Sequence, residues 1–180
     1  AQPAAAAALA LTNAHSINHS EISTIEVFSF HEACRLATRE PADTEQAQYS
    51  LPFPVAAALV HGEVGPAQID GDGLIDADVL RLSRDMVLSE TEAYNNAFPQ
   101  ERFAHVKVTL RDGREFVSET YRADGDPETP LSDDVIVRKY HGLTDPVLGK
   151  ARSGAIRETI EKLETFDDIS VLVELLIPPA

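Results

Sequence analysis

The chain has 180 residues, 43% of them hydrophobic and 25% charged, which is the composition of a folded globular protein and not of a disordered one. Thirty acidic against fifteen basic side chains give a formal net charge of −15 at pH 7. Nucleic acids and anionic membranes bind Lys/Arg-rich surfaces, so we expect no nucleic-acid partner and no membrane partner.

The first predicted element is a helix over residues 4–14, because alanine and leucine are strong helix formers. It is apolar on every face, so we expect it to pack on several sides. Its apolar run is shorter than the roughly 20 residues needed to span a bilayer. No basic stretch precedes it, so it does not resemble a signal peptide.

A strand is predicted over residues 21–30. Ile22 and Phe28 alternate with Ile25 and Val27, so apolar residues stand on both faces. This pattern indicates an interior strand that is covered on both sides.

A short helical turn should begin at Asp43 or Thr44, either of which can cap a helix N-terminus, and should end at Tyr49 and Ser50.

The next helix follows two prolines. Pro52 and Pro54 interrupt regular helix, and Pro54 fits best in the first turn of a helix whose body is residues 55–60. Gly62 is the expected C-terminal stop. A glycine-rich loop over residues 62–73 should follow.

Beyond that loop, a short helix from Asp76 or Asp78 to about Arg81 and a strand at residues 86–88 are expected. Residues 104–110 and 114–121 read as a hairpin. A three-residue loop with Gly113 in the left-handed conformation places Val108 opposite Phe116, whereas a two-residue loop places Val108 opposite Val117. The three-residue register makes the better core.

The C-terminal quarter reads as helical. Ser132 should cap a helix that Gly142 ends, and Ile156, Ile160 and Leu163 form an apolar stripe on a further helix. The run 169–177 is apolar almost all round, which predicts burial against something outside this chain. The fold class that these elements predict is α+β, with a mostly antiparallel sheet and covering helices.

Metal and cofactor motifs are missing from the sequence. The six histidines have no ligand spacing, and the acidic loop at residues 70–76 fails as an EF-hand because Gln68 and Val79 occupy two key ligand positions. No phosphate-binding glycine loop is present. We therefore expect no metal and no cofactor. The single cysteine, Cys34, cannot form an internal disulfide, which favours a cytoplasmic location.

Tyr49 is the strongest candidate for chemistry. A phenol can transfer a proton or orient a carboxylate, but a tyrosine at a helix junction can also serve only in packing. The residues alone leave both interpretations open.

The segment 46–62, in which Tyr49 and Ser50 precede a proline-punctuated, alanine-rich helix, resembles the central motif of the C-terminal half of the MmgE/PrpD family. Other landmarks follow in the family's order. Residues 21–27 resemble the strand that opens the lid domain, residues 98–127 its hairpin and following loop, and residues 130–140 the helix that leads back to the helical domain. Members include 2-methylcitrate dehydratases, cis-aconitate decarboxylases and an iminodisuccinate epimerase.

The resemblance implies three parts: residues 1–20 from a helical domain, an α+β lid over 21–131, and helices at 132–180 that return to the helical domain. It implies that Tyr49 faces the active-site cleft and that Ser50 is the adjoining site serine. Most catalytic groups would lie in a helical domain outside these residues, so we expect the chain alone to be inactive. The implied partners are a small carboxylic-acid substrate and a second copy of the protein.

The alternative is a non-catalytic acidic α+β module that mediates association. Sequence upstream of Ala1 would distinguish the two, because a long helical region supports the enzyme.

Overall fold

The computed structural model describes residues 1–177, which divide into two compact units, Ala1–Thr129 (unit 1) and a second from Pro130 onwards (unit 2). The prediction that residues 1–20 belong to a separate helical domain concerns a longer protein and stays a prediction. None of the helices within residues 1–177 is long and apolar enough to cross a bilayer.

Unit 1 is built on a five-stranded sheet with the order β2-β1-β3-β4, in which β5 also pairs with β3. The strands are β1 (Ile22–Ser29), β2 (Val87–Glu90), β3 (Phe103–Leu110), β4 (Glu115–Val117) and β5 (Tyr121–Arg122). β1 and β2 run parallel, and the other pairs are antiparallel. The predicted α+β fold with a mostly antiparallel sheet is confirmed.

The hairpin between β3 and β4 has the predicted register. Val108 lies opposite Phe116, and Gly113 adopts the left-handed conformation with a φ of 88°. The chain leaves this pairing earlier than expected, because the Ser118 hydroxyl accepts a hydrogen bond from the amide of Val106 (3.0 Å). The second arm therefore divides into β4 and β5, and β5 pairs with the start of β3.

β1 lies inside the sheet, as predicted, but its side chains do not alternate regularly. The register with β3 shifts between Ile22 and Thr24. This irregularity puts Ile22 on the same buried face as Ile25 and Val27, although the simple alternation places it opposite them. The other face carries exposed Thr24 and half-buried Phe28, so the prediction of cover on both sides was wrong for much of its length.

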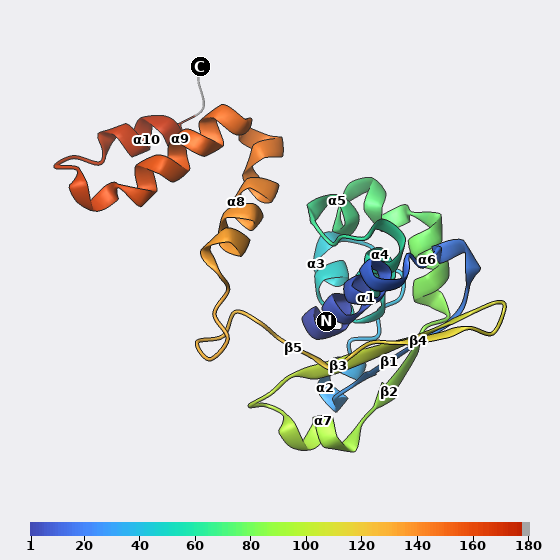
Figure 1. The fold of residues 1–180 in the computed structure, drawn as a ribbon. Helices are drawn as coiled ribbons and strands as arrows, with labels where there is room; N and C mark the ends of the chain where they lie inside the picture. The colour runs from blue at the N-terminus through green and yellow to red at the C-terminus, as the bar shows by residue number, and fades with distance from the viewer. Residues whose placement is uncertain (178–180) are drawn as a thin grey trace. The chain divides into compact units, whose positions relative to one another are not determined.

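Helices are layered on one face of this sheet, while α2 (His31–Cys34) and α7 (Glu92–Ala97) lie on the opposite side in the view of Figure 1. α1 (Gln2–His15) packs directly on β3, and α4 (Pro52–His61) packs on α1 and on α6 (Ala77–Arg84). The shorter elements of the unit are η1 (His19–Glu21), α3 (Thr44–Gln48), α5 (Pro66–Ile69) and η2 (Gly71–Ile75).

α4 is the central helix of the unit, and every residue from Pro52 to Leu59 is buried. It begins at Pro52, so both prolines lie in the first turn, where a helix makes no use of their missing N–H. Gly62 ends it in the left-handed conformation, with a φ of 69°, as predicted.

Two neighbouring predictions need adjustment. The strand expected at residues 86–88 is β2, shifted to Val87–Glu90, and the helix capped by Asp76 continues to Arg84. The glycine-rich loop contains two short helical turns, α5 and η2.

Unit 2 is helical and contains α8 (Asp133–Leu148), α9 (Lys150–Glu161), η3 (Leu163–Thr165) and α10 (Ser170–Leu176). Ser132 precedes α8 as expected, but Gly142 does not end it. A hydrogen bond between His141 Nδ1 and the Asp145 carboxylate (2.9 Å) spans this glycine, and the helix stops only at Gly149, which has a φ of 77°.

The C-terminal run forms α10, which packs on α9. Ile169, Val171, Val173 and Leu176 are exposed, each with at least 42% of its surface open to solvent within residues 1–177. Ile160, on the predicted stripe of α9, is also half exposed, whereas Ile156 is buried.

Candidate functional site

The candidate site lies where α3 meets α4. Asp43 caps α3, since its carboxylate accepts a hydrogen bond from the amide of Gln46 (2.8 Å). α3 ends at Gln48 with Tyr49 as its C-cap, and the buried helix α4 begins three residues after Tyr49, at Pro52. The sequence thus places the Tyr49–Ser50 pair between a capped turn and a helix fixed in the core.

Ser50 is fully buried, and its hydroxyl binds the backbone. It donates a hydrogen bond to the carbonyl of Thr38 (2.6 Å) and accepts one from the amide of Phe53 (3.0 Å) in the first turn of α4. These bonds use the hydroxyl proton and satisfy an amide that the helix leaves unpaired. In this geometry, the Ser50 side chain stabilises the junction.

Tyr49 points the other way. Its side chain is 66% exposed, and no hydrogen bond to its hydroxyl occurs within the described part of the chain. The structure therefore places the two predicted site residues side by side in the chain but separates their side chains. The Tyr49 phenol is free to meet a group outside this chain, and the catalytic roles of Tyr49 and Ser50 stay predictions.

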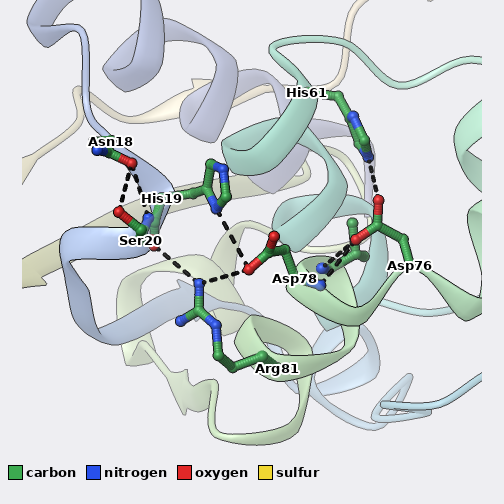
Figure 2. Close-up of polar contacts among 8 residues, drawn as sticks. Asn18, His19, Ser20, His61, Asp76, Asp78 and Arg81 are labelled. Atoms are coloured by element: carbon green, nitrogen blue, oxygen red, sulfur yellow. Dashed lines mark hydrogen bonds and ion pairs between the residues drawn. The ribbon is translucent and has the colours of Figure 1, made fainter.

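A second polar cluster lies at the far end of α4 and was not predicted from the sequence. His61 Nε2 lies 3.1 Å from a carboxylate oxygen of Asp76, and Arg81 joins Asp78 (3.3 Å) to the carbonyl of His19 (3.1 Å), as Figure 2 shows. The helix-capping role of Asp76 was readable from the sequence, but the approach of His61 required the packing of α4 on α6.

The cluster connects α4 and η1 to α6 through side-chain contacts. Within residues 1–177, no group of three or more His, Cys, Asp or Glu side chains is placed to hold a metal ion. His19 Nδ1 lies 3.7 Å from the Asp78 carboxylate, beyond hydrogen-bond distance.

The pKa of Asp76 is set by opposing effects. Burial alone would raise it, but hydrogen bonds from the amides of Val79 and Asp78, together with the nearby His61 ring, outweigh burial and lower it. A carboxyl whose pKa is lower in the folded state adds stability above its unfolded pKa of about 3.9, and this stability is lost as the pH falls through the folded value.

We therefore expect Asp76→Asn to be less stable than the wild type at pH 7, with the difference shrinking as the pH falls below the unfolded pKa of about 3.9 and through the lower folded pKa. Asparagine keeps the N-cap and removes only the charge, whereas Asp76→Ala removes both and should cost about 1 kcal/mol at pH 7. Urea unfolding midpoints measured from pH 3 to pH 7 check this. A difference between Asp76→Asn and wild type that does not change with pH would contradict it.

His105 belongs to a third cluster, on the face of the sheet opposite the main helical layer. Its ring stacks on Phe28 (4.4 Å between centroids), and its Nδ1 lies 2.8 Å from the Tyr94 hydroxyl, which also meets Thr120. Burial lowers the pKa of His105. These contacts give His105 a structural role on this face of the sheet.

The comparisons with known proteins support the family resemblance that the segment around Tyr49 indicates. The family model for the MmgE/PrpD C-terminal domain matches residues 1–165, which is most of the chain. The chain belongs to the MmgE/PrpD family. The match includes the whole of unit 1, and with it the Tyr49–Ser50 junction and the clusters at both ends of α4.

Cis-aconitate decarboxylase of Mus musculus is a distant relative. It is 23% identical over 140 residues, a stretch that covers 78% of this chain and 28% of the relative. The chain therefore spans little more than a quarter of that protein's length.

Proposed function

We propose that this chain is the C-terminal portion of an MmgE/PrpD lyase or isomerase that acts on a small di- or tricarboxylic acid, in the manner of 2-methylcitrate dehydratase. The observation that carries the proposal is the exposed Tyr49 phenol, held by a buried junction in the segment that resembles the family's central motif. Such a group is suited to proton transfer or to orienting a carboxylate, because its position is fixed while its hydroxyl stays available.

In the proposed dehydration or epimerisation, a base removes a proton from the carbon beside a carboxylate. The neighbouring hydroxyl then takes up a proton and leaves as water, or the carbon is reprotonated. In the proposed decarboxylation, carbon dioxide leaves its bonding electrons on the substrate, and a carbon of the substrate gains a proton. Tyr49 donates, accepts or positions a proton at the substrate. Ser50 supports this group by holding the backbone on which Tyr49 stands. The reaction needs no cofactor in this scheme.

The substrate's carboxylates need cationic partners, and a chain with a net charge of −15 repels them on average. We propose that the cationic groups come from a helical domain outside these residues. The activity is therefore a property of the longer protein.

The isolated 180-residue chain should show no turnover of 2-methylcitrate, cis-aconitate or related acids, while the full-length protein converts at least one of them. Proton NMR of each acid after incubation with either protein measures both. Robust turnover by the isolated chain would contradict the proposal that the active site is shared between this chain and a helical domain outside it. An inactive full-length protein would favour the alternative, an acidic association module.

We also propose that the protein works in the cytoplasm as a homo-oligomer. Aliphatic side chains are exposed on α10. Their burial against a second copy would contribute a free energy of roughly 25 cal/mol per Å² of apolar surface, which supports association. Analytical ultracentrifugation of the full-length protein should show a dimer or larger species. A strict monomer at high concentration would rule this out.

A further inference from the structure

The Tyr49–Ser50 junction is tied to a strap, residues 36–40, that connects it to the end of α6. The strap forms no helix or strand, and Leu36 and Thr38 are exposed. It binds the junction at one end and α6 at the other. Its geometry therefore affects where the junction stands.

At the junction end, two backbone carbonyls of the strap accept hydrogen bonds. The carbonyl of Leu36 binds the amide of Leu51 (2.7 Å), and the carbonyl of Thr38 binds the Ser50 hydroxyl (2.6 Å). Both bonds involve the residues directly after Tyr49. Because the Tyr49 side chain makes no hydrogen bond of its own within residues 1–177, its placement depends on this backbone.

At the α6 end, Arg39 binds three carbonyls. Its Nη1 lies 2.9 Å from the oxygen of Ser83, 3.0 Å from that of Arg84 and 2.7 Å from that of Met86. Carbonyls at a helix C-terminus lack intrahelical partners, and a cation there is favourable. The buried Ser83 hydroxyl returns a hydrogen bond to the carbonyl of Arg39 (2.7 Å), so the connection runs in both directions.

A further tie is weaker. Glu40 on the strap pairs with Arg84, but both side chains are more than half exposed, and exposed ion pairs contribute little. Of the Arg39 bonds, those to the carbonyls of Ser83 and Met86 are partly buried. These two bonds therefore hold the strap, since their loss would leave backbone carbonyls without partners.

We infer that Arg39 is a positioning residue for Tyr49, acting through the strap and Ser50. The inference deepens the proposed function and rests on it where turnover is concerned. A reacting group displaced by about 1 Å can lose on the order of 10² in rate, so a strap that shifts the junction changes catalysis without touching the substrate.

The first test is amide hydrogen exchange in the 180-residue chain carrying Arg39→Met, Arg39→Lys or the control Arg84→Met. In Arg39→Met the amides of Leu51 and Phe53 should exchange about 10-fold faster, while that of Gly62, at the other end of α4, stays unchanged. Arg39→Lys keeps three N–H donors and should recover most of the protection. Arg84→Met should match the wild type.

The second test uses the full-length enzyme. Arg39→Met should lower kcat by about 10- to 100-fold with little change in KM, and Arg39→Lys should restore much of the loss. Unchanged exchange at Leu51, or equal acceleration at Gly62, would overturn the inference. If Tyr49→Phe lowers turnover and Arg39→Met does not, the inference about Arg39 is wrong while the proposed function stands. If Tyr49→Phe has no effect, the proposed function fails, and the exchange data still decide whether Arg39 holds the strap.

Discussion

Replacing Tyr49 with phenylalanine in the full-length protein should lower the rate of the chemical step by about 10² to 10⁴, since the variant removes only the hydroxyl that would transfer or orient a proton. Stability should stay within about 0.5 kcal/mol of the wild type, because this hydroxyl is exposed and makes no hydrogen bond within residues 1–177. Steady-state kinetics on the best substrate of the acid panel, with urea unfolding in parallel, measures both effects.

Tyr121→Phe is the matched control. Tyr121 lies on β5, half-buried, and belongs to the same unit as Tyr49. Its variant should keep normal turnover. If Tyr49→Phe also keeps normal turnover, Tyr49 is a packing residue of the junction and takes no part in the chemistry.

Phe53→Ala should destabilise unit 1 by about 3–5 kcal/mol. Phe53 has no exposed surface, stands in the first turn of α4 and belongs to the core cluster, so truncation removes apolar burial and leaves a cavity. With a urea dependence of about 1–3 kcal/mol per molar, the unfolding midpoint should fall on the order of 2 M. Circular dichroism across a urea series measures the shift.

Ile75→Ala provides the comparison. Ile75 lies in η2 of the same unit and is 72% exposed, so its removal should change stability by less than about 0.5 kcal/mol. Equal losses for the two variants would show that α4 is not the centre of the core.

Much of unit 1 was determined by local sequence. Gly62 stops α4 and Gly113 turns the hairpin because each adopts a positive φ, which glycine accepts at low cost. Asp43 and Asp76 cap helices through their own neighbouring amides. Each of these features depends on residues a few positions apart. The sequence therefore indicated them, and left open only whether Asp43 or Thr44 caps the first of these helices and whether Asp76 or Asp78 caps the second.

The irregularity in β1 and the length of α8 were settled by packing. A register shift beside Ile22 turns the Ile22 side chain into the core, because burying both Ile22 and Ile25 outweighs strict alternation of side chains along the strand. Gly142 is a plausible stop by itself, yet the contacts of its neighbours carry α8 past it to Gly149. In both places a local preference was overruled by interactions that the sequence pattern does not contain.

The same division holds at the candidate site. The sequence by itself determined that Tyr49 and Ser50 stand at a rigid helix entrance and which family carries that motif. Only the tertiary structure decided that Ser50 faces inward to Thr38 while Tyr49 faces solvent, and that Arg39 joins this junction to α6. Those contacts join residues 12 to 47 positions apart, and their partners are selected by how the elements pack. Side-chain direction at a junction depends on which backbone carbonyls lie within reach, and the fold alone sets that.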